Sequence, residues 1–139
     1  MALSTRPFTA GDYSSARSLW EKTEGMGLSA SDERDAILAY LARNPGLSLV
    51  AEDADRVVGT LLVGHDGRRG FLNHLAVAES HRRSGLGRRL VDEGLVALKR
   101  VGISKCHLFV FEANPEGQAF WEAVGGERRN DFAVFSFVL

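Results

Sequence analysis

The sequence predicts a single domain of mixed α/β type, in which helices flank a mostly antiparallel sheet. The chain has 139 residues, of which 45% are hydrophobic and 25% are charged, and this composition suits one folded domain with a buried core. Apolar residues recur at helical spacing in four segments, and runs typical of strands lie between these segments. The predicted element order is β-α-α-β-β-β-α-β-α-β.

The N-terminal half is predicted to contain two helices and a three-stranded antiparallel meander. Residues 12–24 place apolar side chains at helical spacing, and Thr9 or Asp12 can cap this helix. A second helix is predicted over 31–43, and it ends before the turn sequence at 44–46. The three strands that follow are predicted at 47–53, 56–67 and 71–77.

An arginine-rich and glycine-rich turn opens the next helix. Gly85 and Gly87 let the backbone bend closely, and the apolar residues that follow have helical spacing, so a helix is predicted from near Ser84 to Gly102. The C-terminal part is predicted to contain a strand at 105–112, a helix at 115–124 and a terminal strand at 131–139.

The turn over residues 82–88 is typical of an anion-binding site. The first N–H groups of a helix have no partner within it, and its dipole favours negative charge there, so a phosphate group is the natural ligand. Two nucleotide-binding motifs do not fit: Arg88 follows Gly87 where the P-loop needs lysine, and Leu90 replaces the third glycine of the dinucleotide motif. The alternative is that the glycines only shape a turn whose arginines are solvated.

Residues 75–77, residues 82–87 and the segment 108–127 together resemble the GNAT superfamily, the Gcn-related N-acetyltransferases. Its signature is a strand ending in L-x-V and then, about four residues later, [RQ]-x-x-G-x-[GA], which Leu75-Ala76-Val77 and Arg82-Arg83-Ser84-Gly85-Leu86-Gly87 match. The segment "LFVFEANPEGQAFWEAVGGE" resembles the family's strand, asparagine and helix with F-Y-x-x-x-G-F, and "RPFTAGDYSSARSLW" looks like its first strand and helix. The resemblance covers essentially the whole chain and implies one GNAT domain over 1–139 with the acyl-CoA N-acyltransferase fold.

The resemblance implies acetyl-CoA as the co-substrate. In the family, backbone N–H groups of the hexad turn hold the pyrophosphate, and the pantetheine arm pairs with the strand that ends in L-x-V. Arg88 and Arg89 are each either a contact to the outer phosphate or a solvated helix residue. The positions carried over as co-substrate contacts are Leu75, Ala76, Val77, Arg82, Arg83, Ser84, Gly85, Leu86, Gly87, Arg88 and Asn114.

The resemblance also implies direct transfer of the acetyl group from the thioester to a primary amine in a ternary complex. The oxyanion would face a backbone N–H near Val77. Family members often carry the general base at places held here by Phe71 and Asn73; neither accepts a proton, although Asn73 can position a water. His74 is adjacent, but strand alternation turns it to the other face unless a bulge intervenes, and a core histidine is the competing interpretation.

The leaving thiolate has no obvious proton donor. Trp121 stands where the family places a tyrosine with this role, and an indole N–H can donate a hydrogen bond without transferring a proton. Glu52 and Glu112 lie at predicted strand ends, where they either relay a proton through water or are solvated. The catalytic candidates are therefore Asn73, His74 and Trp121, together with the backbone of Val77.

Charge is unevenly distributed along the chain. Residues 82–105 hold seven Arg or Lys against two acids, and residues 9–35 hold six acids against three bases. The net charge of −1 argues against general nucleic-acid binding, which stays a distant alternative for the basic stretch. Acids around the loop between the first two helices either suit a cationic amine or form a solvated face; they are Glu21, Glu24, Asp32, Glu33 and Asp35.

Several features bound the location and the partners. The single cysteine, Cys106, forms no internal disulfide, and no segment resembles a secretory signal or a membrane span, so a cytoplasmic protein without a membrane partner is expected. His81 and His107 have no companions at metal-ligand spacing, so no metal is expected. The segment 131–139 is apolar on both faces apart from Ser136, and this predicts a homodimer.

The expected function is that of an acetyl-CoA-dependent N-acetyltransferase. Its amine substrate would be a small molecule, a peptide N-terminus or a lysine side chain, and the sequence does not distinguish among these or between acetyl and other acyl groups. The alternative from a different class is a non-catalytic CoA-binding or regulatory module, which the missing base and the replaced tyrosine favour.

Overall fold

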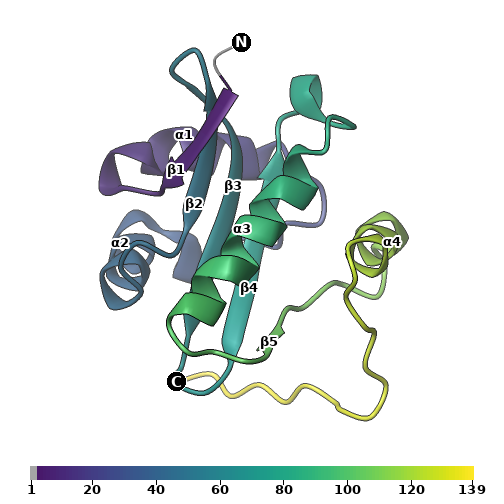
Figure 1. Ribbon diagram of the computed structural model, residues 1–139. Coiled ribbons are helices and arrows are strands. Elements are labelled where there is room, and N and C mark those ends of the chain that lie inside the picture. The colour runs from purple at the N-terminus through teal and green to yellow at the C-terminus, as the bar shows by residue number, and fades with distance from the viewer. Residues whose placement is uncertain (1–2) are drawn as a thin grey trace. The chain divides into compact units, whose positions relative to one another are not determined.

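A computed structural model describes residues 3–139, and its contacts divide the chain into two compact units. The first unit runs to Phe109 and the second covers Val110–Leu139. The first unit contains β1 (Leu3–Pro7), α1 (Tyr13–Glu21), α2 (Arg34–Arg43), β2 (Leu49–Asp53), β3 (Arg56–His65), β4 (Gly70–Val77), α3 (Leu86–Arg100) and β5 (Cys106–His107) (Figure 1). Single turns of 3-10 helix lie at η1 (Ala10–Asp12), η2 (Ala30–Asp32) and η3 (Glu79–His81), and the second unit contains α4 (Pro115–Ala123).

The sheet has the strand order β1-β2-β3-β4-β5, so strands adjacent in the sheet are also consecutive in the chain. The first four strands are antiparallel, and β5 is parallel to β4. The β2–β3 hairpin turns through Ala54 and Asp55 with φ of 49° and 70°, the positive values of a type I′ turn, which matches the twist of the two strands. The predicted mixed, mostly antiparallel sheet flanked by helices is confirmed.

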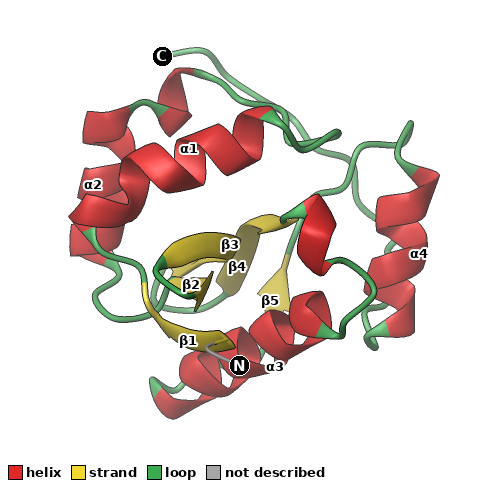
Figure 2. Cartoon of the chain, turned by 90° about the horizontal axis from the view of Figure 1, so that it is seen from above, coloured by secondary structure: helices red, strands yellow, loops and turns green. Residues whose placement is uncertain are grey.

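Helices cover both faces of the sheet (Figure 2). α1 and α2 lie on one face and α3 on the other. The face under α1 and α2 is held by one buried apolar cluster, which stabilises this layer by removing its side chains from water. The cluster consists of Phe8, Tyr13, Ala16, Leu19, Trp20, Ile37, Val50, Leu62 and Ala76.

α3 packs closely on the opposite face because a glycine faces the sheet at the contact. A Cβ built at Gly94 would lie 2.9 Å from Leu61 Cδ2 and 3.2 Å from Val63 Cγ2. Both of these β3 side chains are fully buried, so the backbone of α3 approaches the sheet where only hydrogen fits. The helix ends at Arg100 with Val101 as its C-cap, and Gly102 follows with φ of 89°, the left-handed conformation common after helices.

Three element boundaries differ from the sequence prediction. α3 begins at Leu86 rather than near Ser84, because Gly85 adopts φ of 82° and cannot be helical. β5 keeps only two residues of the strand predicted over 105–112. The terminal strand predicted at 131–139 is wrong: these residues form neither helix nor strand, and their own unit contains no strand edge to which they pair.

Among residues 3–139, no helix is both long and apolar enough to cross a lipid bilayer.

Candidate functional site

One edge of β4 lies open over most of the strand. β3 pairs with β4 along its length, whereas β5 pairs only with Gly70 and Phe71. The backbone groups of residues 72–77 that point away from β3 therefore meet no strand among the residues that the structure describes. Such an edge can pair with an extended ligand in the manner of an added strand.

The last residue of β4 points its amide toward this open edge. The Ala78 N–H donates to Val58 O at 2.8 Å, so these two form a hydrogen-bonded pair of the antiparallel ladder. The neighbouring pair, Gly59 and Val77, is then a non-hydrogen-bonded pair, and the Val77 N–H and C=O point away from β3. The Val77 carbonyl accepts a hydrogen bond from Arg82 Nε at 3.0 Å, which ties the strand edge to the arginine-rich turn.

The turn between β4 and α3 exposes the start of a 15-residue helix. Arg83 has φ of 60° and Gly85 has φ of 82°, and no side chain caps the helix. The first helical backbone bond runs from Arg89 N to Gly85 O at 3.0 Å, so the amides of Leu86 and Gly87 precede the first bonded residue. These amides, with the helix dipole behind them, form a site for an anion.

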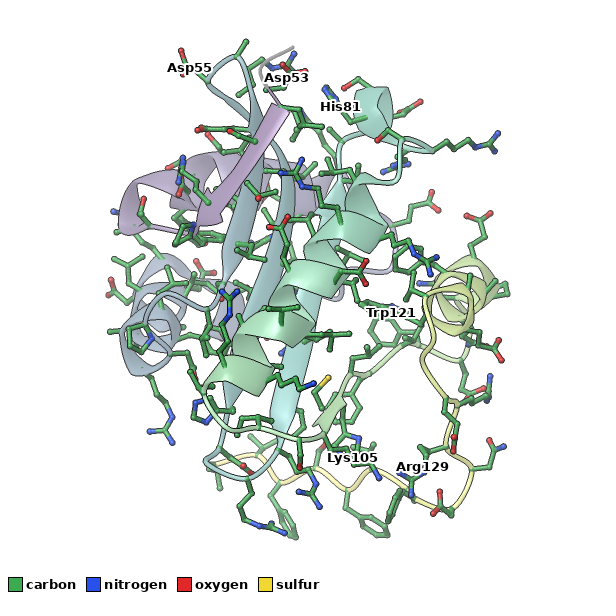
Figure 3. All side chains as sticks on the ribbon, viewed as in Figure 1. Asp53, Asp55, His81, Lys105, Trp121 and Arg129 are labelled. Carbon is green, nitrogen blue, oxygen red and sulfur yellow. The ribbon has the colours of Figure 1, made fainter. Side chains whose placement is uncertain are left out.

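Charge and anchoring complete the turn. Arg82 and Arg83 are exposed beside the helix N-terminus, so their positive charge is available to a phosphate group. The Ser84 hydroxyl donates to His81 O, and the His81 ring contacts Asp53 Oδ2 through Nε2 at 2.8 Å. In Figure 3, Asp53 and His81 lie at the same end of the sheet, so the contact ties the turn to the β2–β3 hairpin.

A β-bulge interrupts the pairing of β4 just before this edge. Asn73 pairs with Leu62 and Ala76 pairs with Thr60, so one residue of β3 opposes two residues of β4. Within the bulge, His74 adopts φ of 52°. Strand alternation was expected to turn His74 to the other face unless a bulge intervened, and this bulge is present. His74 therefore lies on the face covered by α1.

His74 makes three well-defined contacts on that face. Its Nε2 lies 2.5 Å from Asp32 Oδ1, and its ring meets Trp20 edge-on with centroids 4.7 Å apart. The Trp20 indole N–H donates to Thr60 Oγ1 at 2.9 Å, and the Thr60 hydroxyl donates to His74 O at 2.8 Å. Both the ring and the backbone of His74 are thus fixed by hydrogen bonds.

The acids between the first two helices separate into two kinds. Asp32 is only 6% exposed and binds His74, so for this residue the solvated-face interpretation is wrong. In the sequence Asp32 is one of five acids around this loop, and its pairing with a histidine 42 positions away was not predicted. The Ser29-x-x-Asp32 spacing is the signal that could have indicated a fixed carboxylate, because it forms a capping box. The exposed members are Glu21, Glu24, Glu33 and Asp35.

Other candidate residues have partners of their own. Glu52 binds Arg6, whose two terminal guanidinium nitrogens also donate to the two carboxylate oxygens of Asp12, each at 2.8 Å. This contact holds the pKa of the Asp12 carboxyl below its usual range. Arg89 donates to Glu93 at 2.9 Å, which favours its interpretation as a surface helix residue.

Three of the candidate residues, Glu112, Asn114 and Trp121, belong to the second unit. The Asn114 side-chain oxygen accepts from Gly117 N at 3.0 Å and caps α4, so this oxygen is engaged in the helix. Trp121 lies on α4 (Figure 3). Its ring packs edge-on against Phe120 with centroids 5.2 Å apart. Glu112 forms an exposed ion pair with Arg128.

The environment of Cys106 disfavours nucleophilic chemistry at this residue. Burial raises the pKa of the Cys106 thiol, which disfavours the nucleophilic thiolate. Among residues 3–139, no group of three or more His, Cys, Asp or Glu side chains lies close enough to hold a metal ion.

Comparisons with known proteins agree with this arrangement. Residues 13–125 match the family described as the Acetyltransferase (GNAT) family. An acetyltransferase of Photorhabdus laumondii subsp. laumondii is 33% identical over 129 residues, which cover 93% of this chain and 90% of that protein.

Solved structures share the fold at low sequence identity. The PaiA N-acetyltransferase of Thermoplasma acidophilum, solved in complex with coenzyme A, superimposes with a TM-score of 0.79 at 19% identity and covers 95% of this chain and 94% of its own. The aminoglycoside 6'-N-acetyltransferase of Acinetobacter haemolyticus gives a TM-score of 0.78 at 19% identity, with 98% and 99% covered. From the family match and the sequence relatives, this chain belongs to the GNAT family of acetyltransferases.

Proposed function

We propose that this protein transfers the acetyl group of acetyl-CoA to a primary amine by direct attack in a ternary complex. The observation that carries the proposal is the continuity of two features: the open edge of β4 ends at Val77, and Arg82 joins Val77 to the uncapped start of α3. An extended arm and a pyrophosphate at its end fit such an arrangement. Solved members of the fold include one with coenzyme A bound, which supports the same ligand here.

The chain's own groups divide the work of binding. The edge of residues 75–77 would pair with the pantetheine arm, and the amides of Leu86 and Gly87 would hold the pyrophosphate, with Arg82 and Arg83 adding charge. Ser84, Gly85 and Arg88 complete the turn. Asn114 belongs to this set by resemblance alone, because its side-chain oxygen caps α4. The family match spans both compact units, which supports one functional domain over 1–139.

The chemistry asks for an oxyanion donor and for control of two protons. The Val77 N–H points to the open edge, where it would donate to the developing oxyanion of the thioester. Asn73 is exposed on β4 and would hold a water by hydrogen bonds, and Trp121 would donate its indole N–H to the departing sulfur. The amine is a small molecule, a peptide N-terminus or a lysine, and an exposed acidic loop between α1 and α2 supports a cationic one.

The binding half of the proposal is tested by thermal unfolding with acetyl-CoA. A ligand that binds only the native state at a hundredfold excess over Kd stabilises the protein by about 2.7 kcal/mol, so the melting temperature should rise. Gly87→Asp should abolish the rise because a carboxylate would meet the pyrophosphate. Gly11→Asp is the matched control, since a Cβ built at Gly11 has its first contact at 3.9 Å, with Thr9 Oγ1. An unchanged rise in Gly87→Asp would refute the phosphate site.

The catalytic half is tested by release of free thiol from acetyl-CoA with a panel of amines and a no-amine control. Amine-dependent thiol release is the expected result. Binding of acetyl-CoA without turnover of any amine would instead favour the non-catalytic CoA-binding or regulatory module.

A further inference from the structure

We propose that His74 is the general base of the transfer and that Asp32 is its positioning residue. The proposal rests on the proposed function, because it assigns a proton acceptor to amine acetylation. It supplies the base for which the sequence offered no residue at the usual places, Phe71 and Asn73.

The backbone places the His74 side chain where a regular strand would not. Asn73 pairs with Leu62, and Ala76 pairs with Thr60. Both β3 residues face α1, because Leu62 belongs to the apolar cluster and the Thr60 hydroxyl accepts a hydrogen bond from Trp20 of α1. Two residues that share a face are normally two apart on a strand, whereas here they are three apart. The extra residue is accommodated by the positive φ of His74, whose ring joins the same face as Asn73.

The carboxylate of Asp32 is held before any substrate binds. Its Oδ2 accepts the Ser29 N–H at 2.8 Å, and this bond fixes the carboxylate to the backbone of η2. The Tyr13 hydroxyl and the Arg17 guanidinium donate to the main-chain oxygen of Asp32 at 2.6 and 3.1 Å. Oδ1 is left to meet the His74 ring, so ring orientation follows from backbone structure 42 positions away.

This contact determines which ring nitrogen is basic. An ionised carboxylate only accepts hydrogen bonds, so His74 Nε2 carries the proton that it donates to Asp32. In the neutral ring the lone pair then lies on Nδ1, and no group among residues 3–139 is bonded to that nitrogen. Among residues 3–139, the buried side-chain nitrogen and oxygen atoms without a hydrogen-bond partner consist of the Tyr40 hydroxyl alone. Because Nδ1 of His74 has no partner and is not in this set, it is not fully buried and stays accessible to solvent.

A second histidine–aspartate contact in the protein shows the difference. The His81 ring uses both nitrogens, Nε2 toward Asp53 and Nδ1 toward the Ser80 hydroxyl, each at 2.8 Å. Both nitrogens of the His81 ring are therefore hydrogen-bonded, and neither is available as a base. The His74 ring has one nitrogen anchored and one available, which is the arrangement that a base with an orienting acid requires.

The position of His74 in the chain suits the reaction. It directly precedes residues 75–77, the edge to which the acyl-CoA arm is assigned, so the base and the oxyanion donor Val77 lie three positions apart on one strand. A cationic amine first gives one proton to solvent. In the transfer, the neutral amine nitrogen forms a bond to the thioester carbon while its next proton passes to Nδ1. The C–S bond then breaks, and the thiolate takes up one proton from the imidazolium or from solvent, so that one proton leaves the amine and one reaches the sulfur.

The experiment compares His74→Gln and Asp32→Asn with wild type and with His65→Gln as a matched control. His65 is the last residue of β3, and its Nδ1 accepts a hydrogen bond from the Gly67 N–H. We expect kcat to fall by about 10²-fold or more in both site variants, since general base catalysis contributes ~10²–10⁴-fold. The melting-temperature rise with acetyl-CoA should be retained in all variants. Two further variants, His74→Ala and Asp32→Ala, are assayed with added imidazole. Imidazole should restore part of the rate of His74→Ala, because it replaces the missing base, and none of the rate of Asp32→Ala.

A readout independent of activity is the nitrogen-15 spectrum of the His74 ring in the free protein. We expect the Nε2–H tautomer in wild type and the Nδ1–H tautomer in Asp32→Asn, because the new amide donates to Nε2. Wild-type protein with the Nδ1–H tautomer, or His74→Gln with kcat within threefold of wild type, would overturn the inference and leave the proposed function standing. If acetyl-CoA does not raise the melting temperature of wild type, the proposed function is refuted. If wild type binds acetyl-CoA but acetylates no amine, both the proposed function and the assignment of His74 as base are refuted.

Discussion

A methyl group added at Gly94 is expected to destabilise the protein, although alanine favours helices more than glycine does. The propensity gain is about 1 kcal/mol. Against it, the new Cβ would lie 2.9 Å from Leu61 Cδ2 and 3.2 Å from Val63 Cγ2, and both partners are fully buried in β3. Overpacking of this kind costs about 1–3 kcal/mol. The expected net loss for Gly94→Ala is about 1 kcal/mol, or a melting temperature lower by about 3–5 °C for a chain of this size.

Thermal and urea unfolding of four proteins tests this reasoning: wild type, Gly94→Ala, Leu61→Val and the double variant. Leu61→Val removes the Cδ2 atom and destabilises the protein by itself. In that background the effect of Gly94→Ala should shrink to within about 0.5 kcal/mol or become a gain, because the nearest atom is gone. If Gly94→Ala alone melts at or above the wild-type temperature, the close approach of α3 to the sheet is not the reason for this glycine.

Three further predictions concern a charge network, the leaving group and assembly. Arg6 lowers the pKa of Asp12 below its ordinary 3.8, so the ion pair stabilises the folded protein above that pH. This stability is lost as the pH falls through the lowered pKa. The melting temperature of wild type should therefore fall more steeply below about pH 4 than that of Asp12→Asn. Trp121→Phe should lower kcat at saturating substrates by no more than about tenfold, and Trp121→Tyr should be active, whereas a hundredfold loss in a folded Phe variant would give the indole a direct chemical role. Sedimentation at tens of micromolar should show a homodimer, and a monomer alone would contradict it.

Much of the fold was predictable because each signal is local. Helical spacing of apolar residues predicted the four helices to within a few residues, and short turns with polar residues or glycine separated the strands correctly. The start of α3 at Leu86 was also near its predicted place, since the glycines that bend the chain are visible in the sequence.

The bulge at His74 could not be predicted from local sequence. Asn73, His74 and Leu75 contain no glycine or proline, and the register shift exists only because Leu62 and Thr60 of the neighbouring strand fix both sides of it. The contact between Asp32 and His74 depends on that bulge and on the packing of α1 and η2. A contact between positions 42 apart is set by tertiary structure, for which the sequence pattern gives no direct signal.

The C-terminal segment shows the opposite failure. Alternation of apolar residues over 131–139 is a property of the chain alone, whereas a strand also needs an edge whose backbone groups it can bind. The unit Val110–Leu139 offers no such edge, and its large apolar side chains stay exposed, with Phe135 and Phe137 at 85% and 87%. This segment motivates the predicted homodimer.

The agreement between strand order and chain order bears on synthesis at the ribosome. β2, β3 and β4 each pair with the strand made immediately before them, so the partner is present when each of these strands emerges. Every member of the apolar cluster under α1 and α2 lies between Phe8 and Ala76. We therefore expect a nascent chain stopped after residue 78 to be able to close that face of the sheet while α3 is still unmade, so that early folding is dominated by local contacts. The strand edge for the ligand would then form before the helix that completes the phosphate site.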